Sequence, residues 1–192
     1  MPRKSNRILW AKKLAGELPE SSVNIEHLAK KSPFKGNVLG IDPSLRGTGL
    51  ALLTFDGKGN VLLHKSQTLR LKKSLTLHAC LGRISQAVTD ILKLAEVTHV
   101  AIEESIYVQN FRTAQILGAA RGAAIAAAAV EGLPIFEYPP LRIKQAIVGF
   151  GRASKEQMAK TVMQHLGHAT PLPPDEADAA GVALCHSFTF KA

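Results

Sequence analysis

The spacing of apolar residues divides residues 37–192 into alternating strands and helices. Short apolar runs at Val38–Asp42 and Leu50–Phe55 predict the first two strands. The turn signal Asp56–Asn60 indicates that the second strand and a third, Val61–Leu69, form a hairpin. The other expected elements are, in order, helix Leu77–Ala95, strand Thr98–Glu103, helix Asn110–Val130, strand Leu133–Tyr138, and helices Leu141–Val148, Ser154–Leu166 and Asp175–Phe188.

This order predicts an α/β fold. Three antiparallel strands followed by alternating helices and strands imply a five-stranded mixed sheet flanked by helices. The first 36 residues do not continue this pattern and are interpreted as a basic N-terminal arm, with a short helix near Ile8–Leu18, a second weak helix at Ile25–Lys31 and a linker at Ser32–Gly36. We therefore divide the chain into an arm, 1–36, and one compact domain, 37–192.

The charge of the chain points to a polyanionic partner. Lys and Arg outnumber Asp and Glu by 24 to 15, a net charge of +9, and nucleic acid is the first partner to consider. A basic protein that is merely soluble has the same composition, so charge alone leaves both readings open. The arm, with eight basic and three acidic residues, carries +5 of the excess.

The cysteines and the apolar runs favour a cytoplasmic protein. Cys80 and Cys185 lack metal-site spacing, and a reduced pair is favoured over the one disulfide that is formally possible. We expect no apolar run long enough to span a bilayer, since the alanine-rich stretch Ala123–Val130 is short, and no membrane partner.

Two acidic residues end strands that are otherwise apolar. Asp42 follows Val38–Ile41, and Glu103 follows Val100–Ile102. Carboxylates in such places are costly unless they are paired or bind a cation. If the two strands are neighbours in the sheet, their carboxylates converge. Alone, Asp42 could also be a simple turn residue before Pro43.

A second acidic pair opens the last helix. Asp175 and Asp178 are three residues apart and share one helix face, directly after Pro173 and Pro174. These acids could instead complement the helix dipole. Four carboxylates without Cys or paired His suit Mg²⁺ or Mn²⁺, and two such ions about 4 Å apart can hydrolyse a phosphodiester.

The order of several motifs is similar to that of a known family. From Val38 to Ser187 the chain resembles RuvC, the crossover-junction endodeoxyribonucleases that resolve Holliday junctions. The motifs that carry the resemblance are Leu39–Ser44, Ala101–Glu104, Asn110 before the long helix, Leu117–Gly122, Phe136–Tyr138, Ile143–Gln145, Val148–Gly151 and Asp175–Ala180.

This resemblance implies a ribonuclease-H-like fold, a homodimer, two Mg²⁺ ions per site with Mn²⁺ as a substitute, and cleavage of four-way DNA junctions in recombination and repair. It implies the branch-migration proteins RuvA and RuvB as partners. It gives the metal-ligand role to Asp42, Glu103, Asp175 and Asp178, and active-site and DNA-backbone roles to Lys144 and Lys155. Without the resemblance, both lysines are interpreted as solvated helix residues.

Other candidate DNA-binding residues surround the start of the long helix. They are Asn110, Arg112, Ile106 and Tyr107. The last two stand where the family often has two phenylalanines that wedge into the junction, and Tyr107 can still stack on a base. The arm has no counterpart in typical members, and the usual basic tail is nearly absent.

Two alternatives remain open for the function, and one for the long helix. The chain could be a junction-binding scaffold without catalysis, or a related nuclease that acts on structured RNA. The small residues of the long helix could serve a dimer interface or pack on the chain's own sheet. These small residues are Gly118, Ala119, Gly122, Ala123 and Ala126.

Overall fold

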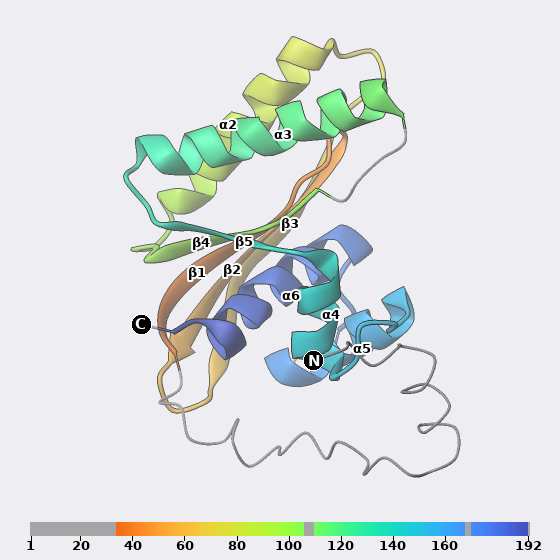
Figure 1. The fold of residues 1–192 in the computed structure, drawn as a ribbon. Helices are drawn as coiled ribbons and strands as arrows, with labels where there is room; N and C mark the ends of the chain where they lie inside the picture. The colour runs from red at the N-terminus through yellow and green to blue at the C-terminus, as the bar shows by residue number, and fades with distance from the viewer. Residues whose placement is uncertain (1–33, 106–109, 168–169, 192) are drawn as a thin grey trace, which may run out of the picture. The chain divides into compact units, whose positions relative to one another are not determined.

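A five-stranded mixed sheet runs through the part of the chain that the structure, a computed structural model, describes: residues 34–105, 110–167 and 170–191. These residues belong to one compact unit, residues 33–192. The strand order is β3-β2-β1-β4-β5, as Figure 1 shows. The strands are β1 (Lys35–Asp42), β2 (Gly47–Asp56), β3 (Val61–Arg70), β4 (His99–Glu103) and β5 (Ile135–Tyr138).

The predicted hairpin and the predicted mixed pairing are both confirmed. β1 pairs antiparallel with β2 and parallel with β4, while β2 pairs antiparallel with β3. The turn between β2 and β3 forms because Asp56 Oδ1 accepts hydrogen bonds from the backbone N–H of Lys58 (2.6 Å) and Asn60 (3.0 Å). Gly57 and Gly59 adopt the positive φ angles, 76° and 101°, that this turn requires.

Helices cover both faces of the sheet (Figure 1). Apolar residues of α2 and α3 share a core with one sheet face, and those of α4, α5 and α6 share a core with the other. The sheet and its helices match the α/β order predicted from the residue pattern, and the arrangement is the ribonuclease-H-like one that the resemblance to RuvC implies. The helices are α2 (Leu77–Leu92), α3 (Phe111–Val130), α4 (Pro140–Val148), α5 (Lys155–Leu166) and α6 (Pro174–Thr189).

Two glycines let α6 lie directly on the sheet. A Cβ atom added to Gly40 would lie 2.1 Å from the carbonyl oxygen of Ala179, and one added to Gly49 would lie 1.9 Å from that of Asp175. Any larger residue at either position would push the helix away. The first turn of α6 is therefore held against the end of β1 and the start of β2.

The two cysteines cannot pair with each other. Both are free and buried, but Cys80 belongs to the core between the sheet and α2/α3, whereas Cys185 belongs to the core beneath α6. The sheet separates them, which agrees with the predicted reduced pair.

The expectation that no apolar run could span a bilayer is wrong, because among the described residues α3 is long and apolar enough, by length and composition, to cross one. The alanines of α3, together with Ile116, Leu117, Ile125 and Val130, raise its hydropathy. One such helix is weak support for a membrane span, since core helices of soluble proteins can be equally long and apolar. Here α3 packs on α2, and its Arg121 forms an ion pair with Glu137 of β5.

Candidate active site at the carboxyl ends of β1 and β4

Asp42 and Glu103 leave adjacent strands side by side. Ile41 pairs with Ile102 in the parallel register of β1 and β4, and the two acids follow these residues directly. Ala101, two residues before Glu103, packs in the core on the α6 face, so alternation directs Glu103 toward α6 as well. The predicted convergence of the two carboxylates is confirmed.

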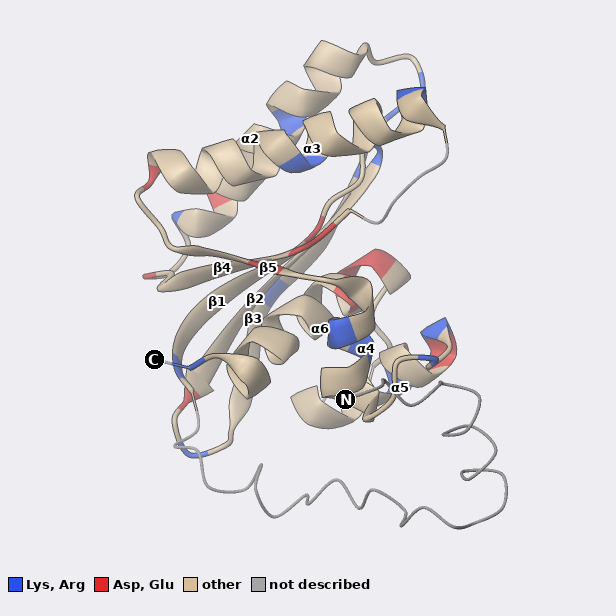
Figure 2. Cartoon of the chain, in the orientation of Figure 1, with Lys and Arg blue, Asp and Glu red and all other residues tan. Residues whose placement is uncertain are grey.

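The start of α6 brings the second acidic pair to the same place (Figure 2). The carbonyl of Asp175 lies on Gly49, the residue that pairs with Asp42. Asp178, one turn later, is close enough to raise the pKa of both Asp42 and Glu103. The four predicted ligands are therefore neighbours in space.

The carboxylates of this cluster repel one another in a half-buried place. Burial, and then the charges of Asp178 and Asp175, raise the pKa of Asp42 to about 7. Burial, followed by Asp42 and Asp178, raises the pKa of Glu103 to about 7. The pKa of Asp178 is also raised, mainly by burial. A cation held here would relieve both the repulsion and the lost solvation.

This electrostatic pattern argues against the simpler interpretations. A carboxylate whose main role is to complement a helix N-terminus has a lowered pKa, but that of Asp178 is raised. The turn after β1 is held by Ser44 rather than by Asp42: Ser44 Oγ accepts from Gly47 N–H (2.9 Å), and its carbonyl accepts from Thr48 Oγ1 (2.5 Å). Asp42 is thus left available to the cluster.

Two lysines from other helices face the acids. Lys155, the first residue of α5, has its Nζ 3.9 Å from Asp178 Oδ2 and favours the charged form of Asp42, Glu103 and Asp178. Lys144 of α4 acts in the same direction on Glu103 and Asp178. The residue pattern alone gave no signal for either lysine, because α4 and α5 are brought to the site by tertiary contacts, chiefly with α6.

The donor set fits a hard divalent cation. Four carboxylates outnumber the two lysines, and oxygen ligands of this kind are those that Mg²⁺ and Mn²⁺ prefer. Within the described parts of the chain, no three Asp, Glu, His or Cys side chains are already arranged to hold one ion. The fit therefore rests on donor chemistry and on the raised pKa values, and binding would require the carboxylates to turn toward a shared ion.

A fifth acid, Glu176, has a different role that sequence reasoning missed. Its carboxylate accepts hydrogen bonds from Ser66 Oγ (2.5 Å) and Thr68 Oγ1 (3.4 Å) on the edge strand β3. Glu176 therefore ties the first turn of α6 to the far side of the hairpin. It steadies the start of α6, the part of the helix that carries Asp175 and Asp178.

The remaining predicted DNA-binding residues have mixed outcomes. Asn110 caps α3, since its Oδ1 accepts from the backbone N–H of Thr113 (3.0 Å). Arg112 is exposed in the first turn of α3. Ile106 and Tyr107 lie outside the described residues.

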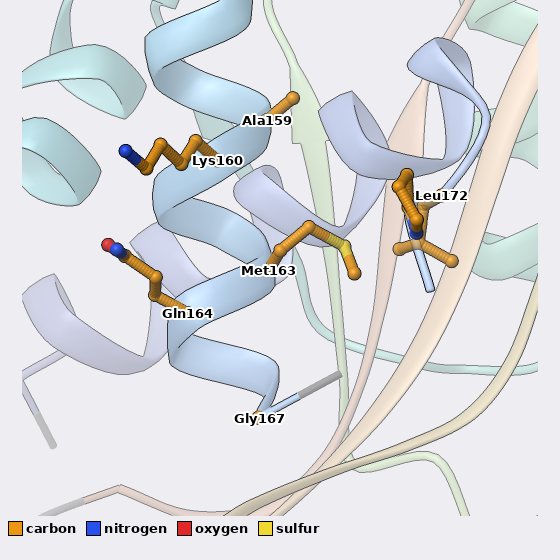
Figure 3. Close-up of a pocket in the computed structure, with 7 residues that line it drawn as sticks. Ala159, Lys160, Met163, Gln164, Gly167 and Leu172 are labelled. Atoms are coloured by element: carbon orange, nitrogen blue, oxygen red, sulfur yellow. The ribbon is translucent and has the colours of Figure 1, made fainter. Parts of the chain in front are cut away.

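A surface groove along α5 is distinct from the acidic cluster (Figure 3). It carries no carboxylate, so it lacks the groups that metal-assisted hydrolysis needs. Its lining consists of Ala159, Lys160, Met163, Gln164, Gly167, Pro171 and Leu172.

Known proteins match most of this chain in sequence. The family model described as crossover junction endodeoxyribonuclease RuvC matches residues 38–186. The enzyme of that name from Halorhodospira halophila is 42% identical over 150 residues, which cover 78% of this chain and 89% of the relative. The one from Pelotomaculum thermopropionicum is 37% identical over 153 residues, covering 78% and 92%.

Solved structures of Holliday junction resolvases superpose on this chain. The structure of T. thermophilus RuvC in complex with Holliday junction substrate superposes with a TM-score of 0.75 at 32% identity, covering 80% of this chain and 93% of that one. The yeast mitochondrial Holliday junction resolvase Ydc2 superposes with a TM-score of 0.60 at 14% identity, covering 95% and 91%, and shares the fold. From the family-model match, the identity to its curated relatives and the common fold, the chain belongs to the RuvC family of crossover junction endodeoxyribonucleases.

Proposed function

We propose that this protein is an endonuclease that resolves four-way DNA junctions by divalent-metal-assisted hydrolysis of phosphodiester bonds. The proposal rests on the proximity of Asp42, Glu103 and Asp178 to two lysines at the carboxyl ends of β1 and β4. A second support is the RuvC of T. thermophilus, whose structure contains a Holliday junction substrate.

The electrostatic contacts suggest how the carboxylates divide their work. Asp42 and Asp178 each influence, or are influenced by, all three of the other acids, whereas Glu103 and Asp175 show no such contact with one another. We therefore place Asp42 and Asp178 at the centre, with Glu103 on one side and Asp175 on the other. Two Mg²⁺ ions, or Mn²⁺ in their place, would activate water and stabilise the leaving oxygen.

The lysines complete the site. Lys155 and Lys144 both favour the charged form of Glu103 and would neutralise charge that develops on the scissile phosphate. Because they come from α5 and α4, they would contact the DNA strand from the face of the sheet that α6 covers.

We further propose a homodimer that uses the exposed face of α3. Ala120, Ala124, Ala127 and Ala128 of this helix pack inside the chain. Gly118, Gly122 and Ala126 are exposed, and a Cβ added to either glycine would meet no atom within 4 Å. These small residues are thus not needed for the chain's own packing, but they would allow a second α3 to approach closely. A two-fold dimer places one site on each of two opposed strands of a junction.

The test compares matched four-way junctions of DNA and of RNA, with Mg²⁺ and with EDTA. We expect paired nicks in the DNA junction only when the metal is present. Binding without cleavage in Mg²⁺ would favour the scaffold alternative, and faster cleavage of the RNA junction would favour an RNA nuclease. Sedimentation of the wild type and of Gly122→Leu checks the dimer, which the leucine should weaken. Action in the cytoplasm, and binding of RuvA and RuvB, are part of the same proposal.

A further inference from the structure

Arg46 joins the turn after β1 to the segment that connects β3 with α2. Its guanidinium donates hydrogen bonds to the carbonyl oxygens of Lys72 and Leu75, the latter at 3.0 Å. Its own carbonyl accepts from Leu71 N–H (3.1 Å), and within the segment Leu75 N–H donates to the Lys72 carbonyl (3.1 Å). One side chain therefore fixes the path of an otherwise irregular connection.

The connection that Arg46 fixes is strongly basic and exposed. We define the basic loop as residues 70–74, in which Arg70, Lys72 and Lys73 are all exposed. Six Lys or Arg residues and no acidic residue lie between Asp56 and Asp90. The ion pairs found within the described ranges, Arg121–Glu137 and Lys155–Asp178, do not involve this loop. Its charge is thus available to a partner.

The basic loop begins next to the acidic cluster. A Cβ on Gly47, the residue after Arg46, would lie 3.5 Å from Asp175 Oδ2. Gly47 pairs with Arg70 across β2 and β3, and paired strands lie about 4.8 Å apart. Lys72 and Lys73 then lead outward toward α2, where Figure 2 shows basic segments between the end of β3 and the helix.

This position differs from that of the two site lysines. Lys144 and Lys155 belong to α4 and α5, on the face of the sheet that α6 covers, whereas the basic loop leads to α2 on the other face. A DNA strand bound at the carboxylates would leave the site on one of these two sides. The basic loop offers phosphate contacts on the side where Lys144 and Lys155 offer none.

We propose that the basic loop binds the phosphate backbone of the DNA arm that leaves the acidic cluster toward α2, and that Arg46 is the positioning residue that holds the loop in place. The partner is nucleic acid, as the proposed function on which this inference rests requires. Lysine ammonium groups act as point charges on phosphates, so the contact gives affinity and register but reads no sequence. Arg46 turns its donors inward to carbonyls and acts through the loop.

The experiment measures DNA affinity by fluorescence anisotropy in EDTA, where no cleavage occurs, across a series of NaCl concentrations. Lys72→Gln with Lys73→Gln should reduce the log–log salt slope by about 1.8, since each lost phosphate contact contributes about 0.9. The matched control is Lys58→Gln with Lys93→Gln, which removes the same charge from exposed residues at the opposite end of the sheet. A loop variant with the slope of this control would overturn the proposal.

Arg46→Ala tests the positioning role. It should lower the salt slope nearly as much as the double loop variant and raise KM for junction cleavage more than it lowers kcat. Arg46→Lys, which can reach only one of the two carbonyls, should recover part of the slope. Thermal unfolding shows that each variant is folded. A wild-type slope in folded Arg46→Ala would refute this role.

Failure of the inference can be told from failure of the proposed function. The salt slope is measured on a linear duplex as well as on a four-way junction. If the wild type neither prefers nor cleaves the junction, the proposed function fails, yet the loop variants still reveal backbone binding on the duplex.

Discussion

Asp42 and Glu103 lie side by side because the residues before them, Ile41 and Ile102, pair in register across two parallel strands. Sixty residues of chain separate them, but the parallel pairing of β1 and β4 places their carboxylates next to each other. Burial, and then the charges of neighbouring carboxylates that include Asp178, raise the pKa of each to about 7. The protein therefore keeps a cluster of mutually repelling carboxylates at the carboxyl ends of β1 and β4. A bound cation would remove the free-energy cost of that repulsion.

Asp42→Asn should abolish cleavage and leave junction binding nearly intact. The substitution removes a central charge that we propose holds the metal, whereas DNA affinity is expected to come mainly from Lys and Arg. We expect a loss of rate of roughly a hundredfold or more, with Kd for the junction within a few-fold of the wild type. Gel-shift and cleavage assays on one junction check both parts. Cleavage near the wild-type rate in Mg²⁺ would rule out this ligand assignment.

The same variant should stabilise the metal-free protein. The pKa of Asp42 rises from 3.8 to about 7 on folding, so the folded state binds protons more tightly than the unfolded state, and stability falls as the pH rises from about 4 to 7. Asparagine removes that loss, which is at most about 4 kcal/mol at about 1.36 kcal/mol per pKa unit.

Thermal unfolding at pH 8 in EDTA checks this expectation, with Tm higher for Asp42→Asn by several degrees. Adding Mg²⁺ should raise the Tm of the wild type more than that of the variant, because only the wild type retains the full ligand set. Equal Tm values for wild type and variant in EDTA would contradict the expected destabilisation by the Asp42 carboxylate.

The residue pattern could predict the sheet and the acidic strand ends, because both follow from apolar runs that end in a single acid. It could not predict the lysines. Lys144 and Lys155 are ordinary helix residues until α4 and α5 pack on α6, a contact between distant parts of the chain. The start of β1 at Lys35, three residues earlier than Val38, was missed because Lys35, Gly36 and Asn37 carry no strand signal and are ordered by pairing with β2.

This earlier start changes the truncation that tests the N-terminal arm. Phe34 contacts the rings of Phe55, His99, His186 and Phe190, with centroids 5.1–5.7 Å apart. Deleting residues 1–32, which carry seven basic and three acidic residues, should leave a folded enzyme with weaker and less salt-sensitive DNA binding.

Deleting residues 1–36 should also cost stability, since it removes Phe34 and the first two residues of β1. Salt-dependent binding and Tm, measured for both truncations, separate the two effects. An unchanged salt slope after removal of residues 1–32 would show that the arm does not touch DNA. Equal Tm for the two truncations would show that Phe34 contributes little to the fold.

Acid should destabilise the fold through His186. This fully buried side chain lies 2.7 Å from the Tyr138 hydroxyl and 3.1 Å from His99 Nδ1, and burial, with the charge of His99, lowers its pKa to about 4. The unfolded chain takes up a proton near pH 6.5, so this contribution is complete above that pH and is lost progressively as the pH falls toward 4.

Between pH 6.5 and pH 4, the unfolding free energy lost through His186 amounts to about 3 kcal/mol. His186→Gln keeps hydrogen-bonding groups but does not titrate, so the difference in unfolding free energy between wild type and variant should shrink as the pH falls from 7 to 4.5. Urea unfolding at several pH values measures that difference, in which the opposite effect of Asp42 and Glu103 cancels. A difference that does not depend on pH would contradict this assignment.

Glu103 and Glu104 are adjacent acids with different expected roles. Ala101 packs toward α6 and Ile102 toward α2 and α3, so Glu103 faces the cluster. The backbone N–H of Glu104 still donates to the Tyr138 carbonyl (2.9 Å), which continues the pairing of β4 with β5 through this residue. Alternation therefore turns Glu104 to the opposite side of the sheet.

Glu103→Gln should lower kcat by a factor of 100 or more, roughly 2.7 kcal/mol in the transition state. Glu104→Gln keeps every carboxylate of the cluster and should cost roughly tenfold at most, about 1.4 kcal/mol. Single-turnover rates at saturating Mg²⁺ compare the two, and Glu104→Gln is the matched control for loss of one negative charge at this strand end. A larger loss from Glu104→Gln would mean that the ligand is the other acid, and that the end of β4 is shifted by one residue from the register described above.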